Sequence, residues 1–355
     1  MLFGYVLVKR LYELFVGENV GRVVDPGSAN DNLRHKGLFV SPLQIPTGGQ
    51  DGGDSARERK RDGMGPDHKR LSKWLTGRDS FAECLHPALL ESCRVQKLAL
   101  IDRVVCLEQD SAFFAWSTGF REEDTGQPVT ALWGWEGGTD EKAALLKRSL
   151  DELEGHLMVE LATGDSDAQL LADHGFVLER HRLSLNPQEH ILDTPRQGRY
   201  SLRLATELDR VMLCTLAADY AQYTVPPGRE ELLQQYTASI LGRFRAVDFG
   251  PDSAVDLFVA EENYQSVGYI LVELMPDGTV YLEDIGVKRA HWGKYVAQFM
   301  VRAVENLLVQ YGVELLWCEI SAANRRSYLT AVRSLRFQPR VEIWLHRRHE
   351  NLSSL

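Results

Sequence analysis

Residues 279–310 combine backbone and side-chain groups that can bind a phosphate. The segment begins with residues that favour β-strands, and after the loop 288–295 the spacing of apolar residues becomes helical. A strand, loop and helix in this order leave unpaired N–H groups at the start of the helix, where the helix dipole favours negative charge. Lys288, Arg289 and Lys294 add positive charge to the loop. The segment therefore predicts a phosphate cradle.

Carboxylates in and beside this segment can move protons. Glu283 is four residues before Val287 and is predicted on the same strand face, whereas Asp284 is predicted on the other. A carboxylate beside a closed apolar site can have a raised pKa and accept a proton from a bound ligand. Glu283 is therefore the preferred base over Asp284, and Glu319 on the next predicted strand is an alternative. A solvated rim carboxylate without a chemical role is the competing interpretation.

Two tyrosines are candidates for the opposite task, donating a proton. Tyr328 shares a helix face with Asn324 and Ala331, and Tyr295 lies in the basic loop. Either ring can instead be a packed aromatic with its hydroxyl at the surface. Cys318 lies in the middle of a predicted strand, where a buried small apolar residue is expected and not a nucleophile.

Composition limits the kinds of protein to which the chain can belong. Its 355 residues are 44% hydrophobic and 25% charged, which is typical of a globular protein with room for two domains. A formal charge of −10 argues against a general nucleic-acid binder. The five cysteines are dispersed without metal-ligand spacing, so we expect reduced thiols and no metal site. No stretch predicts a membrane span or signal peptide, and we expect a cytoplasmic protein.

The start of the chain differs from the rest. Residues 46–70 contain no Val, Leu, Ile or aromatic residue, and Gly, Asp, Arg and Lys are frequent. Such a segment buries too little apolar surface to offset the entropy cost of ordering it. We therefore expect residues 1–70 to be a disordered extension, or a non-native one if translation begins at Met64.

The remaining chain contains the same order of elements twice. In residues 71–190, strands are followed by a helix, a strand, a helix ending in Gly-Phe and a last strand, and this order returns in residues 248–347. We interpret this as an internal duplication. Where the second half has its basic loop, the first half has residues 136–141, whose carboxylates would repel a pyrophosphate. The first half is therefore predicted to be catalytically silent.

The second half is predicted to be a domain at residues 199–349, after a proline-containing linker at residues 191–198 and before a tail at residues 350–355. Its expected order is β-α-α-β-β-β-α-β-α-β. The expected strands are residues 200–205, 255–260, 267–274, 279–287, 314–320 and 340–346, and the four expected helices are residues 206–220, a helix from residue 230, a helix after residue 295, and residues 324–335.

This order, together with the basic loop, resembles the GNAT superfamily of N-acetyltransferases. The loop of that family reads Arg/Gln-x-x-Gly-x-Gly/Ala after a strand that ends in Val. Here Ala297 matches the last position, and Gly293 is the additional glycine that many members carry. Trp292 stands at the Arg/Gln position, and Tyr295 stands at the first motif glycine.

The last predicted helix carries a second partial motif. The family reads Asn, Ala three residues later, Tyr seven residues later, and then Gly-Phe; the corresponding residues are Asn324, Ser327, Ala331 and Arg336-Phe337. Counting back from Phe337 places the Tyr position at Val332, so the Tyr is absent in either count. Because that Tyr commonly reprotonates the coenzyme A thiolate, the resemblance leaves Tyr328, Tyr295 or water for this role.

The resemblance implies an α/β fold of two GNAT-like domains, each a mixed, mostly antiparallel sheet flanked by helices. It implies acetyl-CoA as co-substrate, no metal, and direct attack of an amine in a ternary complex, with Glu283 and Tyr328 as catalytic residues. Gly286 is suited to a bulge that separates its strand from the next, where the acetyl arm would lie. The implied cofactor-binding residues are Val287, Lys288, Arg289, Trp292, Gly293, Lys294, Tyr295, Val296, Ala297 and Asn324.

Several alternatives stay open. The acceptor is a small amine, an antibiotic, a polyamine or a protein amine, and the acidic balance of the chain favours a cationic one. The substitutions at Trp292, Tyr295, Ala331 and Arg336 favour a non-catalytic coenzyme A binding or sensing module. A scaffold without a ligand is the third interpretation. We expect neither nucleic-acid nor membrane partners, and the oligomeric state is left open.

Overall fold

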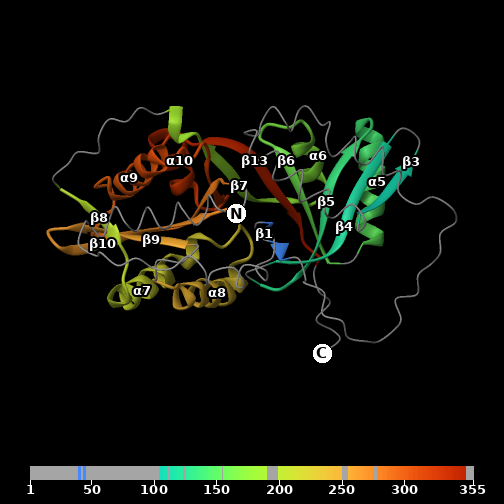
Figure 1. Ribbon diagram of the computed structural model, residues 1–355. Helices are drawn as coiled ribbons and strands as arrows, with labels where there is room; N and C mark the ends of the chain where they lie inside the picture. The colour runs from blue at the N-terminus through green and yellow to red at the C-terminus, as the bar shows by residue number, and fades with distance from the viewer. Residues whose placement is uncertain are drawn as a thin grey trace, which may run out of the picture. The chain divides into compact units, whose positions relative to one another are not determined.

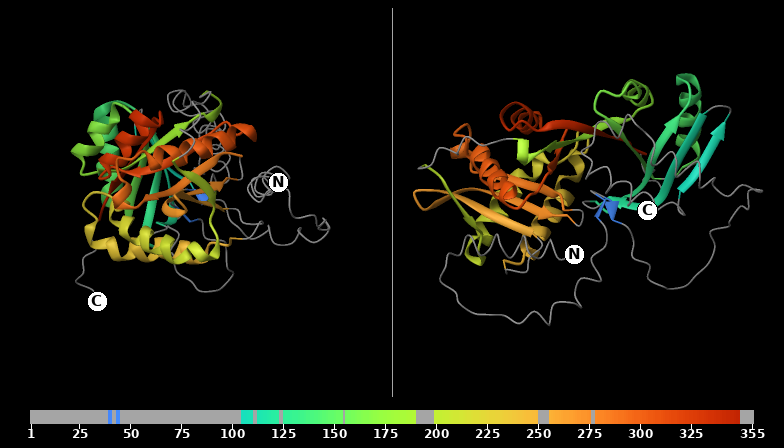
Figure 2. Two further views of the ribbon diagram at one scale, coloured as in Figure 1. Left: turned by 90° about the vertical axis from the view of Figure 1, so that its left-hand side faces the viewer. Right: turned by 45° about the horizontal axis from the view of Figure 1, so that its top comes forward.

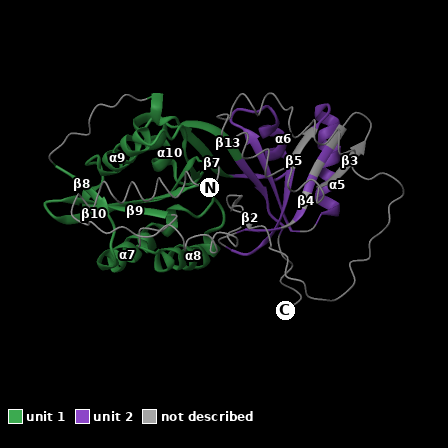
Figure 3. Cartoon of the chain, viewed as in Figure 1, with its two compact units in different colours: residues 1–25, 85–89, 179–342 green, residues 26–84, 90–178, 343–355 purple. Residues whose placement is uncertain are grey.

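A computed structural model describes residues 39–40, 43–44, 104–109, 112–122, 125–153, 155–189, 199–249, 255–275 and 278–348 (Figure 1). The chain divides into two compact units (Figure 3). Unit 1 comprises residues 1–25, 85–89 and 179–342, and unit 2 comprises residues 26–84, 90–178 and 343–355. The predicted linker and tail lie outside the described residues, and the domain boundaries given above stay predictions.

Unit 1 contains a mixed, mostly antiparallel sheet in the order β13-β7-β12-β11-β10-β9-β8. Its strands are β7 (Val177–Leu185), β8 (Ser201–Leu204), β9 (Val255–Glu262), β10 (Gln265–Leu274), β11 (Val280–Val287), β12 (Leu316–Ser321) and β13 (Gln338–His346), of which residues 179–185 and 338–342 of β7 and β13 belong to this unit. Neighbours from β8 to β11 are antiparallel, β11 and β12 are parallel, and β12 and β7 are antiparallel. The predicted α/β class, with a mixed and mostly antiparallel sheet flanked by helices, is confirmed for this unit.

Helices cover both faces of this sheet (Figure 2). The helices α7 (Arg210–Tyr220) and α8 (Leu233–Ala246) pack on one face, and α9 (Val296–Gln310) and α10 (Arg325–Ser334) pack on the other. Strand β10 is apolar on both faces: Tyr269 packs with α7 and α8, and Ile270 packs with α9. This double burial explains why β10 is a nearly continuous apolar run without alternation.

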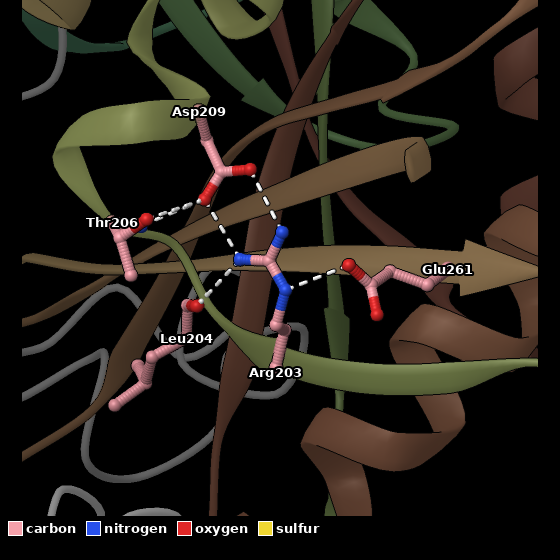
Figure 4. A network of polar contacts seen from close by, with 5 residues as sticks. All are labelled: Arg203, Leu204, Thr206, Asp209 and Glu261. Carbon is pink, nitrogen blue, oxygen red and sulfur yellow. Dashed lines mark hydrogen bonds and ion pairs between the residues drawn. The ribbon is translucent and has the colours of Figure 1, made fainter. Parts of the chain in front are cut away.

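A charged network fastens the start of α7 to the sheet (Figure 4). Arg203 of β8 donates hydrogen bonds of 2.7 and 2.8 Å to Asp209 and one of 2.8 Å to Glu261 of β9. Asp209 also accepts a 2.8 Å bond from the N–H of Thr206, as the predicted capping box requires. The hydrogen bonds from Arg203 lower the pKa of Asp209, although burial opposes them. The network fixes where α7 begins.

The described part of unit 2 has the same local order of strands and helices as unit 1. It contains β1 (Phe39–Val40), β2 (Leu43–Gln44), β3 (Val104–Gln109), β4 (Ala112–Glu122), β5 (Pro128–Glu136), α5 (Thr139–Glu152), β6 (His156–Ala162) and α6 (Asp167–Asp173). Strands β5 and β6 are parallel, like β11 and β12. Strands β1 and β2 fall within the extension predicted to be disordered; its other residues lie outside the described part. That this half is a silent copy stays a prediction.

Candidate active site

Strands β11 and β12 of unit 1 start as neighbours and then separate. They pair at Val280↔Leu316, Tyr281↔Trp317 and Leu282↔Cys318. Beyond these pairs β11 continues to Val287 without β12, while β12 stays paired with β7 as far as Ser321. We call this unpaired stretch, residues 283–287 of β11 and 319–321 of β12, the splay. The sequence predicted a separation at this place, and the structure confirms it.

The pairing of β11 with β10 determines which peptide groups face the splay. The N–H of Lys288 donates a 2.9 Å bond to the carbonyl of Val267 on the β10 side. Because peptide groups alternate in direction along an antiparallel strand, Gly286 also faces β10, whereas Ile285 and Val287 face the splay. The N–H of Val287 is therefore directed to the place where a thioester arm was predicted to bind.

The bulge in β11 lies at Glu283 and not at Gly286, where the sequence predicted it. The register changes from Leu271↔Asp284 to Val272↔Leu282, so Glu283 is the extra residue of β11 at this point. Gly286 has a different role, because a Cβ there would lie 2.4 Å from a ring atom of Tyr269. The glycine is needed for the close approach of this tyrosine.

The bulge also changes where the two carboxylates lie. Glu283 pairs with Arg243 of α8 at 3.0 Å, and Asp284 accepts a 2.7 Å hydrogen bond from Tyr269, which packs against α7 and α8. Both carboxylates therefore face these helices, whereas Val287 packs with the α9 side of the core. The prediction that Glu283 shares a face with Val287 is wrong, because the bulge interrupts the alternation on which it rested.

Asp284 is the carboxylate with the more unusual environment. Asp284 as a whole residue is partly exposed, but its carboxyl group is buried, and this burial raises its pKa. The hydrogen bonds from Tyr269 and from the N–H of Ile285 oppose this rise. A carboxyl group with a raised pKa is suited to exchange a proton closer to neutral pH. Asp284 is therefore the better candidate for the proton acceptor, a role that the sequence analysis gave to Glu283.

Glu319, the alternative base, is held by a buried ion pair. Nε and Nη2 of Arg182 on β7 lie 2.9 and 2.8 Å from one carboxylate oxygen of Glu319, and the two side chains are only 6% and 3% exposed. Arg182 also lies over the ring of Trp317, 5.7 Å from its centroid. This environment assigns Glu319 to the contact between β7 and β12.

The loop before α9 is the segment that was predicted to be the phosphate cradle. Gly293 has a φ of 73° and Tyr295 a φ of 65°, and the side chain of Tyr295 is 72% exposed and so does not fill the loop. The first turn of α9 has no acidic residue and no side-chain cap. Among the described residues, none accepts a hydrogen bond from the N–H of Val296 or Ala297. The start of α9 therefore presents free N–H groups to a ligand.

The corresponding helix of unit 2 has a different start. Asp140 and Glu141 lie in the first turn of α5, and Glu141 accepts a 3.0 Å hydrogen bond from the N–H of Gly138. These carboxylates neutralise the positive end of the helix dipole and occupy the position of an anion. The contrast favours unit 1 as the unit that binds a phosphate.

Trp292 links the loop to the end of β11. Its Nε1 lies 2.7 Å from both the carbonyl oxygen of Val287 and the hydroxyl of Tyr220, and this hydroxyl itself donates to the Val287 carbonyl. The guanidinium of Arg326 lies over the indole, 4.5 Å from its centroid, and the ring of Tyr223 is 6.4 Å away. Burial raises the pKa of Tyr220. Sequence reasoning did not assign Tyr220, Tyr223 or Arg326 to this contact.

The start of α10 holds the other predicted residues. Asn324 caps the helix, because its side-chain oxygen accepts a 3.1 Å bond from the N–H of Ser327. The ring of Tyr328 lies 4.5 Å from that of His181 on β7, and its hydroxyl has no hydrogen-bond partner within the described ranges. Ala331, at the position of the missing tyrosine, is buried. Tyr328 and Glu283 therefore lie on opposite faces of the sheet.

Two further observations concern the part of the chain that the structure describes. It contains no helix that is both long and apolar enough to cross a membrane. It also contains no group of three or more His, Cys, Asp or Glu side chains arranged to hold a metal ion. Cys318 is buried, and burial raises the pKa of its thiol, which agrees with the structural role predicted for it.

Comparisons with known proteins were made for the whole chain. No curated protein matches it. A solved tandem GNAT protein from the clavulanic acid biosynthesis pathway is 13% identical, with 80% of this chain and 97% of that chain covered and a TM-score of 0.42. A GCN5-related N-acetyltransferase from Sphaerobacter thermophilus is 15% identical, with 74% and 88% covered and a TM-score of 0.44. Similarity at this level supports no conclusion about activity.

The family comparison is more specific. Residues 212–331 match the model of the acetyltransferase (GNAT) family. The match runs from α7 into α10 and includes β11, the loop at Trp292 and the start of α9. It therefore contains the splay and the cradle. This region of the chain is a domain of the acetyltransferase (GNAT) family.

Proposed function

We propose that the domain at residues 199–349 transfers an acetyl group from acetyl-CoA to an amine, by direct attack in a ternary complex. One observation carries the proposal: the splay, towards which Val287 turns its N–H, leads directly into a helix start with free N–H groups. An acyl thioester attached to a pyrophosphate needs these two features next to each other. They lie within the residues that match the family.

The chain's own groups fit each part of this ligand. The N–H groups of Val296 and Ala297 at the start of α9 would bind the pyrophosphate, with Lys288, Arg289 and Lys294 adding positive charge. The thioester arm would lie in the splay, where the N–H of Val287 would bind the thioester carbonyl oxygen. The same donor would stabilise the negative charge that develops on this oxygen during attack.

Asp284 is the base that the geometry favours. Glu283 is already paired with Arg243, whereas burial raises the pKa of Asp284. Asp284 would take a proton from the amine, directly or through water, as the nitrogen attacks and the C–S bond breaks. Glu283 stays the second candidate. Tyr328 or water would then give a proton to the thiolate.

The acceptor would enter from the side of α7 and α8, because both carboxylates face these helices. In its ionised form Asp284 attracts a cationic amine more strongly than a neutral one, whereas Glu283 is already paired with Arg243. We therefore propose a cationic amine, either small or on a protein. The segment 220–229 after α7 is fastened at this side by a hydrogen bond from Ser321 to the carbonyl of Val225.

A second function, coenzyme A binding without transfer, is favoured by one observation. Ala331 is buried where the family's proton donor is expected. The test is release of thiol from acetyl-CoA by the full-length protein, measured with a panel of amines that includes spermidine and a peptide with a free N-terminus. Amine-dependent release is expected. Tight binding of acetyl-CoA without release by any amine would favour the second function.

A further inference from the structure

Trp292 stands where three parts of unit 1 approach the outer end of the splay. Its indole N–H bonds to Val287 of β11 and to Tyr220 at the end of α7, and its ring lies under Arg326 of α10, the helix that follows β12. The side chain is only partly buried. A single indole therefore bridges β11, the end of α7 and α10 beside the splay.

The hydrogen bonds of Trp292 compete with those of such an arm. An extended ligand with amide groups binds a strand edge as another strand does, by donating to carbonyls and accepting from N–H groups. The Val287 carbonyl faces the splay and already accepts hydrogen bonds from Trp292 and Tyr220. A carbonyl oxygen has two lone pairs, so these two hydrogen bonds use the full capacity of the Val287 carbonyl to accept hydrogen bonds.

We propose that Trp292, held by Tyr220, is a plug that coenzyme A displaces when it binds. This inference rests on the proposed function, because it assumes that the ligand arm lies in the splay. Gly293, the residue after Trp292, is exposed and has no atom within 4 Å of the position of a Cβ, so the chain beside the plug has room to move. The side chains of Trp292 and Tyr220 therefore set the affinity for coenzyme A, in addition to the backbone N–H groups of the phosphate cradle.

The first test is calorimetric titration of the full-length protein with coenzyme A. Trp292→Phe keeps an aromatic ring but removes the N–H donor, and Tyr220→Phe removes the hydroxyl. Each variant is expected to bind coenzyme A several-fold more tightly, and the double variant about tenfold more tightly, or ~1.4 kcal/mol. Tyr264→Phe, on a side chain that is 97% exposed in the β9–β10 turn, is the control and is expected to leave the affinity unchanged.

A second measurement keeps the test valid if a variant folds poorly. Addition of coenzyme A to the parent protein is expected to change tryptophan emission as the indole leaves its contacts, and Trp292→Phe is expected to abolish this change although six other tryptophans remain of the seven. Equal or weaker binding by Trp292→Phe, or binding by the parent without an emission change, would overturn the plug. If neither the parent nor any variant binds, the proposed function itself fails.

Discussion

Two residues of the GNAT domain adopt a backbone conformation that favours glycine. Tyr295 and Arg336 each have a φ of 65°, and each stands where the family resemblance places a glycine. The left-handed conformation costs a residue with a Cβ about 1 kcal/mol or more. Both side chains are exposed, so neither is compensated by burial. The sequence identified these two positions as exceptional, and the backbone gives the physical reason.

Replacing Arg336 by glycine should therefore stabilise the protein. We expect Arg336→Gly to raise the free energy of unfolding by about 0.5–1 kcal/mol. Relief of backbone strain stabilises the folded state, and the greater entropy that glycine gives the unfolded chain offsets part of this gain. Urea denaturation measures this change. Arg333→Gly, at an exposed position inside α10, is the control and should destabilise by about 1 kcal/mol. Destabilisation by both variants would show that the positive φ of Arg336 carries no strain.

The base assignment is tested by the pH dependence of transfer. The rate should rise with pH as Asp284 loses its proton, and because burial raises its pKa, this rise should lie above the pH at which an ordinary aspartate titrates. Asp284→Asn should lower kcat by a factor of about 10² to 10⁴ and remove the rise, whereas Glu283→Gln should keep it. A pH–rate profile with the best amine of the panel measures both. If only Glu283→Gln removes the rise, the assignment is reversed.

At the scale of elements, local sequence patterns were sufficient for the strand, loop and helix that carry the site. They were insufficient for the bulge, because an extra residue in β11 is defined by its pairing with β10. The amino-acid sequence of β11 alone does not reveal it. This is why Glu283 was assigned to the wrong face. Tyr220 and Trp292, which are 72 positions apart in the sequence, meet only through tertiary packing.

Gly286 gives a test of the packing around the bulge. Gly286→Ala should destabilise the protein by about 1–3 kcal/mol, because the added methyl group would meet the Tyr269 ring in the core. Chemical denaturation measures the loss. Gly242→Ala in α8, where nothing lies within 4 Å of a new Cβ, should instead stabilise by up to about 1 kcal/mol. Equal effects of the two substitutions would argue against the close approach of Tyr269.

At the scale of the whole molecule, a strand from the segment predicted to be the first domain, residues 71–190, belongs to the sheet of unit 1. Residues 180–185 of β7 pair with β12, and β7 supplies Arg182 to Glu319 and His181 to Tyr328. Periodicity identified β7 as a strand but not its neighbour, because strand pairing over such a sequence separation depends on the complete fold. The half that was predicted to be silent thus contributes to the candidate site of the other.

The buried pair of Arg182 and Glu319 tests this contribution. Arg182→Leu should destabilise the protein by about 3–5 kcal/mol, because it leaves a carboxylate buried without a partner. Adding Glu319→Leu should recover most of the loss, and a double-mutant cycle in urea measures the coupling between the strands. Additive effects of the two substitutions would contradict a direct contact between β7 and β12.

The most direct test of the account is calorimetric titration of the full-length protein with acetyl-CoA, repeated with a matched pair of glycine variants. Gly293 and Gly312 lie at opposite ends of α9, have φ values of 73° and 70°, and have no atom within 4 Å of a new Cβ. Aspartate therefore introduces the same charge at a similar backbone conformation in both.

We predict one site of micromolar affinity, worth about 8 kcal/mol, in the parent protein and in Gly312→Asp, and its loss in Gly293→Asp. A parent protein that does not bind acetyl-CoA, or equal binding by the two variants, would contradict the account.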